Sequence, residues 1–344
     1  MSELTDHSPS ASTLPATLSQ MTLFREMPDS EFPTTKPFDK TTPPPKPNSD
    51  GWDPEAAALR LEQSGDYRIL RRVVPRPIIP RSESLFPNLA ALVDVETTGF
   101  DHSRDEVIEI GAVTFTYDDA GVIGDVVGVY GSFQEPSFPI PPEITRITGI
   151  TDEMVSGHKI DTAALDLIIA DADLVIAHKA SFDRTFCEKL TPSFVRKPWA
   201  CSVEEIDWKE RGFEGSKLAY LASQSGFFYL KHRATSDCQA LLEVLDKSAD
   251  MDAQTPFAEL LRASARTRVR VYAQGTPFDL KEILKAKGYR WSDGSDGRPK
   301  AWWIEVDEEA LEDQRCFLRT EIYRRSQLEP LTTRLTAFER WRAG

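Results

Sequence analysis

The chain has 344 residues, of which 40% are hydrophobic and 10% aromatic, and this composition predicts a globular protein of about two domains. Its formal net charge is −14, yet residues 251–344 contain 17 Lys and Arg against 15 Asp and Glu, so the excess acidity lies before them. Clustered carboxylates that hold divalent cations would be neutralised, and net charge therefore does not exclude nucleic acid as a partner.

Membrane insertion and export are not expected. No stretch reaches the roughly 18 uninterrupted apolar residues that a membrane-spanning helix needs. The N-terminus, MSELTDHSPS, has neither a basic nor an apolar segment, which argues against an export signal. The four cysteines lack CxxC spacing, which predicts reduced thiols in a cytoplasmic protein rather than a zinc site or disulfides: Cys187, Cys201, Cys238 and Cys316.

The first 85 residues divide into two segments. Residues 1–50 are rich in Pro, Ser and Thr, which predicts a disordered leader. Residues 51–85 combine a short helix at 53–64, with Asp53 as its N-cap, and an arginine-rich segment. That segment either follows a phosphate backbone or forms a linker that lies on the next domain, and both interpretations stay open for its arginines: Arg68, Arg71, Arg72, Arg76 and Arg81.

Residues 86–250 have the pattern of an α/β domain. The run LAALVDV is typical of a central strand that is buried on both faces, and two further strands follow it. Helices and strands then alternate, which predicts a mixed sheet with helices on both faces. The expected strands are 89–95, 106–117, 126–133, 174–180 and 199–206, and the expected helices are 162–172, 181–190, 216–226 and 234–249.

Residues 251–344 predict a small accessory α+β domain. We expect strands at 266–273 and 298–306 and helices at 279–288 and 307–325. Aromatic residues alternate with bases around Trp291 and at the pair Trp302–Trp303. Two interpretations are open: a surface on which nucleotide bases stack while cations meet phosphates, or tryptophans that form the core of a small domain.

Four acidic residues form the most informative pattern. The period of two along a strand places Asp94 and Glu96 on one face, where the strand ends. Asp183 and Asp237 lie in the first turns of two predicted helices, and His232 immediately precedes the second helix. Taken alone, each residue is better explained as a solvated strand end, a helix start or a surface histidine. Together, at one edge of a sheet, they favour a metal site.

Such a set suits phosphodiester cleavage with two metal ions. Mg²⁺ and Mn²⁺ prefer oxygen ligands, and two ions held by shared carboxylates can bind the attacking and the leaving oxygen. Histidine titrates near neutral pH, so His232 can accept a proton from the attacking water. A cation between Asp94 and Glu96 also explains why a buried strand would end in two acids.

The motifs resemble those of the DEDDh 3′→5′ exonucleases, a family that includes the epsilon proofreading subunit of bacterial DNA polymerase III, RNase T and oligoribonuclease. The motifs are D-V-E-T-T-G at 94–99, A-H-K-A-S-F-D at 177–183 and H-R-A-T-S-D at 232–237. I-T-G-I-T at 147–151 supports the match, which extends over 89–248. The resemblance implies an RNase H-like mixed sheet flanked by helices.

The resemblance also implies roles for individual residues. Two divalent cations, Mg²⁺ or Mn²⁺, would be bound by Asp94, Glu96, Asp183 and Asp237, and His232 would be the general base. The resemblance places the backbone of Thr97 against the terminal nucleotide and Ile147 near the last base. Lys179 stands where the family usually has Asn, so it could meet a phosphate or point to solvent, and this departure bears on substrate preference.

The implied reaction is hydrolysis of the 3′-terminal phosphodiester with release of 5′-mononucleotides. The 3′ end of DNA is the favoured substrate because the motifs are similar to those of the epsilon subunit, which also suggests a DNA polymerase subunit as a partner. An exoribonuclease that trims RNA 3′ ends is the alternative. A non-catalytic module that binds nucleic acid or a polymerase is disfavoured, because none of the five catalytic residues is missing.

Overall fold

The computed structural model describes residues 53–81, 86–247, 254–295 and 297–342. The predicted leader, residues 1–50, lies outside the described residues. The first described element is helix α2 (Pro54–Gln63), which belongs to a unit, residues 1–66, separate from residues 67–344. As predicted, Asp53 is its N-cap, and the carboxylate accepts a hydrogen bond from the Glu55 backbone N–H at 3.0 Å.

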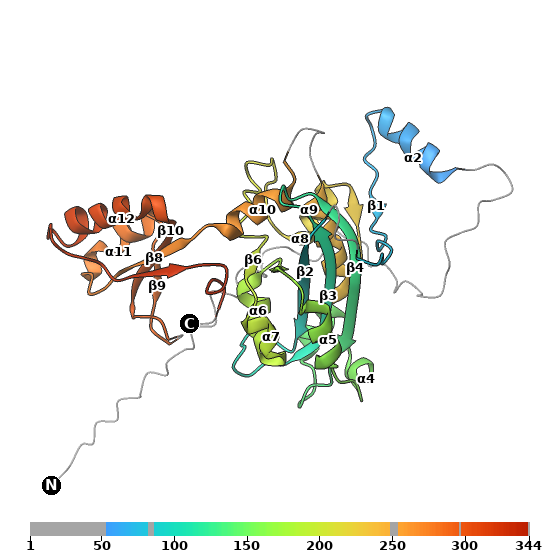
Figure 1. The fold of residues 1–344 in the computed structure, drawn as a ribbon, viewed down its shortest axis with the longest axis horizontal. Coiled ribbons are helices and arrows are strands. Elements are labelled where there is room, and N and C mark those ends of the chain that lie inside the picture. The colour runs from blue at the N-terminus through green and yellow to red at the C-terminus, as the bar shows by residue number, and fades with distance from the viewer. Residues whose placement is uncertain (1–52, 82–85, 248–253, 296, 343–344) are drawn as a thin grey trace, which may run out of the picture. The chain divides into compact units, whose positions relative to one another are not determined.

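The larger unit is built on a five-stranded sheet of order β4-β3-β2-β5-β6 (Figure 1). Its strands are β2 (Asn88–Thr97), β3 (Val107–Tyr117), β4 (Ile123–Phe133), β5 (Leu174–Ala177) and β6 (Trp199–Cys201). β2, β3 and β4 pair antiparallel, whereas β5 and β6 continue the sheet parallel to β2. The mixed sheet predicted from the order of elements is confirmed.

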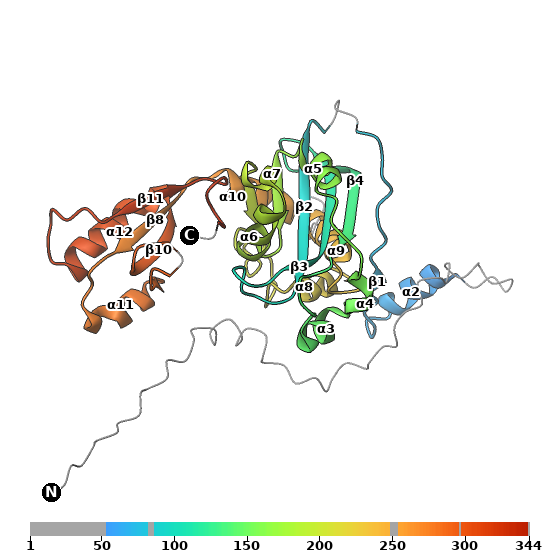
Figure 2. The same cartoon turned by 90° about the horizontal axis from the view of Figure 1, so that it is seen from below.

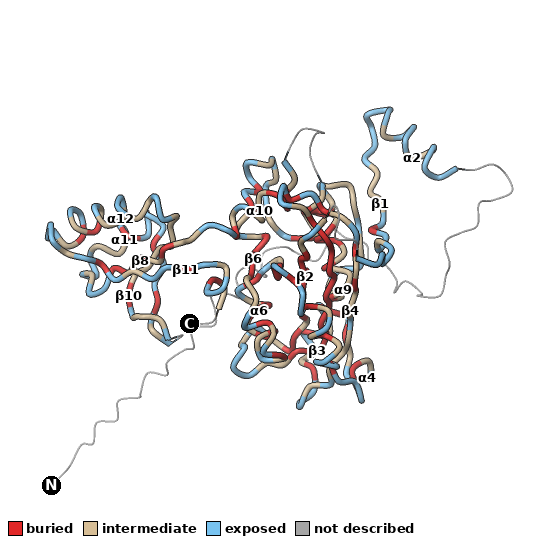
Figure 3. The backbone as a smooth tube through the Cα atoms, in the orientation of Figure 1, coloured by how far each residue is buried: buried red, intermediate tan, exposed pale blue. Residues whose placement is uncertain are grey.

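Helices cover both faces of this sheet, seen from two directions in Figures 1 and 2. Because side chains alternate along β2, Leu92 packs with one group of helices and Val93 with the other. One face holds α8 (Leu218–Gln224), α9 (Ala234–Asp246) and α10 (Pro256–Ala265); the other holds α5 (Thr162–Ile169), α6 (Ala180–Leu190) and α7 (Pro192–Val195). Every residue of β3 is buried (Figure 3). The predicted α/β class, a mixed sheet flanked by helices, is thus confirmed.

The connection from β4 to α5 contains two short helices, α3 (Pro142–Thr148) and α4 (Asp152–Val155), which pack together around Ile144 and Val155. The predicted strand 199–206 is wrong beyond Cys201. There the Glu205 carboxylate accepts a hydrogen bond from the Cys201 backbone N–H at 2.7 Å, and the chain turns. No helix among the described residues is long and apolar enough to span a bilayer.

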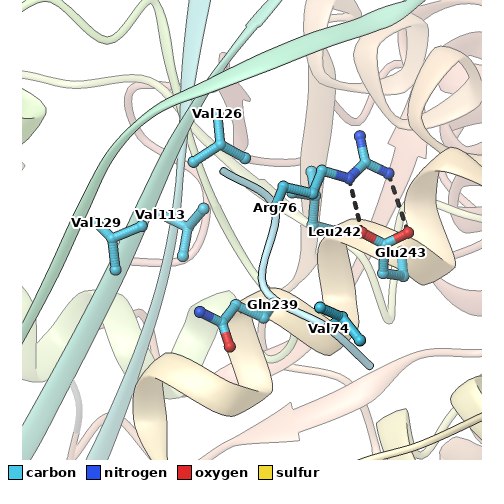
Figure 4. A pocket seen from close by; sticks show the side chains of 8 residues that line it. All are labelled: Val74, Arg76, Val113, Val126, Val129, Gln239, Leu242 and Glu243. Atoms are coloured by element: carbon cyan, nitrogen blue, oxygen red, sulfur yellow. Dashed lines mark hydrogen bonds and ion pairs between the residues drawn. The ribbon is translucent and has the colours of Figure 1, made fainter. Parts of the chain in front are cut away.

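The arginine-rich segment lies on the sheet domain, as one of its two interpretations proposed. β1 (Arg71–Arg72) pairs in parallel with β7 (Phe227–Phe228), and the Arg76 guanidinium bonds to Glu243 and Asp246 of α9 at 2.7 Å each. Figure 4 shows the Arg76–Glu243 pair beside a cavity of about 10 Å³. That cavity is lined by Val74, Arg76, Val113, Val126, Val129, Gln239, Leu242 and Glu243.

A second sheet, of order β11-β8-β10-β9, forms the C-terminal part of the chain. Its elements are β8 (Arg268–Ala273), α11 (Lys281–Ala286), β9 (Arg290–Ser292), β10 (Ala301–Asp307), α12 (Leu311–Phe317) and β11 (Thr332–Leu335). The helix expected at 307–325 is shorter: a 3₁₀ turn precedes α12 and a π turn follows it. β11 escaped prediction because four residues, TTRL, are too short for a periodic signal.

After β11 the chain returns to the domain built on the five-stranded sheet, where it contacts the buried side chain of Arg184 on α6. The Arg184 guanidinium donates to the backbone carbonyls of Arg340 at 2.7 Å and Phe338 at 2.8 Å, and its Nε donates to Glu188 at 2.7 Å. The Trp199 backbone N–H donates to the Ala337 carbonyl at 2.8 Å. A fully buried guanidinium needs such partners, so the segment 336–342 completes this part of the domain.

Arg184→Ala should therefore destabilise the protein by about 3–5 kcal/mol, the range for breaking a buried ion pair, because carbonyls and a carboxylate would lose their donor. Urea-induced unfolding followed by tryptophan fluorescence measures this change. The matched control is Arg104→Ala, whose side chain is 72% exposed in its pair with Asp101 and whose loss should barely shift the midpoint. Equal stability of the two variants would contradict a structural role for the returning segment.

Candidate active site

The end of β2 positions the first two acids. Asp94 lies opposite Gly111 of β3 and Glu96 opposite Glu109, and the register shifts between Glu96 and Thr97, where the strand ends. Such an irregularity bends the strand and changes the direction in which its side chains point. Asp94 and Glu96 are both half-buried, and they lie on one face as the period of two predicted.

A glycine on β3 lets the helix that carries Asp237 approach these acids. A Cβ atom at Gly111 would lie 2.4 Å from the backbone of Ala234 and Thr235 at the start of α9, so no other residue fits there without moving the helix. In this arrangement, carboxylate oxygens of Asp94, Glu96 and Asp237 lie within 4.8 Å of one another. Oxygens this close match the spacing of ligands around a single cation.

Asp183 enters from the opposite side of the sheet, in the first turn of α6. It is buried, only 3% exposed, and its Oδ1 accepts a hydrogen bond from the Val95 backbone N–H at 3.2 Å. Val95 lies between Asp94 and Glu96 on β2, so this bond holds Asp183 beside them. The structure thus brings all four predicted acids to the end of β2.

Burial and mutual repulsion shape the protonation of this cluster. Burial, followed by repulsion from Asp237, raises the pKa of Asp94 well above its ordinary value. The same two causes raise the pKa of Glu96 to about 8, and burial raises that of Asp183 to about 7 and that of Asp237 to about 6. A bound cation would reverse this effect, because it stabilises the charged form of every carboxylate around it.

His232 occupies the turn before α9, where the sequence predicts it, and its backbone φ of 59° lies in the left-handed region. Few residues other than glycine adopt this conformation, so neighbouring contacts must hold it. Burial, with a smaller effect from Lys231, lowers the pKa of His232 below its ordinary value. The imidazole is therefore neutral near pH 7, and a ring nitrogen is available to accept a proton.

The contact that holds this turn is an ion pair that the motifs did not reveal. The Arg233 guanidinium donates to both carboxylate oxygens of Glu109 at 2.9–3.2 Å, and the ring of Phe133 lies 5.1 Å from it. Glu109 is only 6% exposed and also accepts a bond from the Ala234 backbone N–H at 3.3 Å. In the sequence, the only sign of this ion pair was a single acid within the otherwise uncharged strand VIEIGAVTFTY.

Asp237 has two further partners that orient it. Its Oδ1 accepts a hydrogen bond from the Tyr229 hydroxyl at 3.0 Å, and its Oδ2 accepts one from the Arg233 backbone N–H at 3.0 Å. Tyr229 was not among the predicted residues. The Tyr229 hydroxyl uses one lone pair of the Asp237 carboxylate. The lone pairs that accept no hydrogen bond stay available to a cation.

The three predicted substrate-binding residues have different surroundings. Thr97 is buried at the end of β2, and its hydroxyl donates to the Gly99 carbonyl at 2.6 Å. Ile147 on α3 is 42% exposed. Lys179 precedes α6 and pairs with Glu204 at 2.6 Å, so its ammonium group is engaged by a carboxylate rather than solvent alone. The neighbouring His178 has its ring between the Ser202 hydroxyl and the Ser216 carbonyl, which gives it a structural role.

Comparison with known proteins identifies the domain that carries this site. Residues 92–245 match the model of the exonuclease family of RNase T type. Over these residues the chain is similar to the exonuclease family, and the resemblance to DEDDh 3′→5′ exonucleases is confirmed at this level.

Three relatives illustrate the match. A DNA polymerase III PolC-type protein of Clostridium perfringens is 29% identical over 174 residues, covering 49% of this chain and 12% of that protein. DNA polymerase III subunit epsilon of Treponema pallidum is 29% identical over 167 residues, covering 44% of this chain and 72% of the subunit. The 3′-5′ exonuclease DinG of Bacillus subtilis is 26% identical over 273 residues, covering 72% of this chain and 27% of DinG. The chain thus spans a small part of the PolC-type relative.

The raised pKa values predict how metal-free protein responds to pH. Carboxyls whose pKa is higher in the folded state favour folding below their ordinary pKa, near 4, and this contribution is lost as pH rises through about 6–8. With a chelator, the thermal midpoint should therefore fall by about 5 °C between roughly pH 5 and pH 8. Millimolar Mg²⁺ or Mn²⁺ should restore the midpoint, most strongly at the higher pH.

Differential scanning fluorimetry measures these midpoints, and Asp94→Asn is the control. Removing one acid relieves repulsion, so the variant should show a flatter pH dependence without metal and a smaller response to Mg²⁺. Identical profiles for wild type and Asp94→Asn, with no response to either cation, would contradict an electrostatic cluster that binds metal.

Proposed function

We propose that the protein is a metal-dependent 3′→5′ exonuclease that hydrolyses the terminal phosphodiester of DNA and releases nucleoside 5′-monophosphates. The observation that carries this proposal is the convergence of Asp94, Glu96 and Asp237 within 4.8 Å, with Asp183 bound to the same strand. The match of residues 92–245 to the exonuclease-family model supports the reaction class.

The donor set fits divalent cations. All ligands are carboxylate oxygens, which Mg²⁺ and Mn²⁺ prefer over softer metals, and the repulsion among them favours a cation at their centre. Two such ions would be held by Asp94, Glu96, Asp183 and Asp237. When bound, they would supply charge stabilisation for the attacking and leaving oxygens of the phosphodiester.

His232 is the proposed general base. Its lowered pKa keeps the ring neutral, so it accepts a proton from the water whose oxygen attacks phosphorus. The bond between phosphorus and the 3′ oxygen of the shortened strand then breaks, and that oxygen takes up a proton from solvent. The Arg233–Glu109 pair fixes the turn at His232, so it acts as a positioning element in this proposal.

Three residues would bind the terminal nucleotide. Thr97 offers its backbone at the end of β2, and the exposed apolar side chain of Ile147 would lie against the last base. Lys179 would exchange its Glu204 partner for a phosphate, since a half-exposed pair on the surface costs little to open. This role would belong to the lysine that stands where the resembled family usually has Asn.

DNA is the preferred substrate because the relatives are named as DNA polymerase III proteins. The same relatives suggest association with a DNA polymerase subunit. RNA is the alternative substrate, since reading the 2′-hydroxyl needs contacts beyond the acidic cluster.

Incubating the protein with 5′-labelled single-stranded DNA and Mg²⁺ should produce a ladder that shortens from the 3′ end. His232→Ala should lower the rate by about 10²–10⁴-fold, the usual contribution of a general base, while leaving binding in chelator unchanged. Gel electrophoresis of timed samples measures both rates. A parallel RNA strand tests the alternative, and intact DNA and RNA with either Mg²⁺ or Mn²⁺ would contradict the proposed function.

A further inference from the structure

The β9–β10 edge of the C-terminal sheet gathers arginines around one tryptophan. The guanidinium carbons of Arg270 and Arg298 both lie 5.0 Å from the ring centroid of Trp303, and that of Arg290 lies 5.6 Å from it. Arg270 comes from β8, Arg290 from β9 and Arg298 from the connection between β9 and β10. Three segments thus deliver cations to a single indole.

Three like charges this close repel one another, so the arrangement needs compensation. The indole supplies part of it through cation–π contacts. Glu305 supplies more, since its carboxylate bonds to Arg270 at 2.6 Å and 2.8 Å. The surrounding sequence remains basic: residues 281–303 contain six Lys and Arg against three Asp and Glu, in a chain of net charge −14. Planar guanidiniums in such a group complement phosphate oxygens.

Trp291 is an independent feature of the same edge, and it lies on the opposite face of the sheet from Arg290 because successive residues of β9 alternate between the faces. It lies on β9, the outermost strand of the sheet, and is 51% exposed. Its ring is 5.6 Å from that of Trp302, which packs on the core of the C-terminal sheet. Trp291 is therefore supported on one side and open to solvent on the other. Supported, exposed rings of this kind are the platforms on which nucleotide bases stack.

We propose that the β9–β10 edge binds single-stranded nucleic acid that passes over β9, with Trp291 stacking on a base on one face and Arg290 and Arg298 binding the phosphodiester backbone on the other. The proposal rests on the proposed function, because the bound strand would be the one whose 3′ end the exonuclease domain degrades. For the exposed Trp291, the proposal favours the interpretation that nucleotide bases stack on the ring. For Trp302 it favours the interpretation of a core residue, because this side chain packs against the core of the C-terminal sheet.

Direct binding tests the role of Trp291. Fluorescence anisotropy of a labelled single-stranded DNA about 20 nucleotides long, measured in chelator, reports affinity without cleavage. Trp291→Ala should weaken binding about tenfold, whereas Trp291→Phe, which keeps an aromatic ring, should remain within about threefold of wild type. Equal affinities of wild type and Trp291→Ala would overturn the proposal.

The arginines are tested by salt dependence. Each of Arg290→Gln and Arg298→Gln should lower the slope of log affinity against log salt concentration by about 0.7, as for loss of one phosphate contact to a single strand. Arg334→Gln is the matched control, because Arg334 lies on β11, the opposite edge of the sheet. If Arg334→Gln lowered the slope by the same amount, the result would overturn the proposal, because it would indicate non-specific attraction between the basic sheet and the phosphates.

Turnover separates this proposal from the proposed function. With Mg²⁺, Trp291→Ala should raise KM for the long strand more than KM for a trinucleotide, because a trinucleotide offers few bases and phosphates beyond those that the active site binds. Loss of cleavage on both substrates would overturn the assignment of Trp291 to strand binding. If wild type cleaves neither substrate, the proposed function fails, while the binding experiment still decides the role of the β9–β10 edge.

Discussion

The repulsion among carboxylates that the fold holds together at the end of β2 is the constraint on which the rest of the structure depends. Burial and neighbouring acids raise the pKa of Asp94 and Glu96, so the fully ionised cluster is unfavourable without protons or a compensating positive charge. Several features exist to maintain it. Gly111 lets α9 approach β3, and the Val95 backbone N–H fixes Asp183 on α6. The ion pair of Arg233 with Glu109 compensates a further buried acid.

Much of this arrangement follows from local sequence patterns. The period of two along β2 predicted that Asp94 and Glu96 share a face, and the mixed sheet followed from the order of strands and helices. The Arg233–Glu109 pair could not be predicted, because it joins residues 124 positions apart and no local pattern encodes such a contact. The end of β6 at Cys201 was missed for a related reason: Glu205 reaches back to cap the strand, and a carboxylate in an extended pattern gives no sign of this.

The C-terminal part of the chain is linked to the exonuclease domain by its last described residues. Carbonyls of Phe338 and Arg340 bind the guanidinium of Arg184, the residue that follows Asp183 on α6. The segment 336–342, which follows β11, thus supports the helix that carries one of the four acids. This segment links the small sheet to that helix, a structural role in addition to the strand binding proposed for the β9–β10 edge.

The occupancy of the acidic cluster by metal is the most direct test of these conclusions. Crystals of the protein grown with Mn²⁺ and a nucleoside 5′-monophosphate should be measured by anomalous X-ray diffraction. Two anomalous peaks, about 3.5–4 Å apart and within bonding distance of Asp94, Glu96, Asp183 and Asp237, are the predicted result. A fully occupied Mn²⁺ elsewhere, with none at these carboxylates, would contradict the assignment of this cluster as the catalytic metal site.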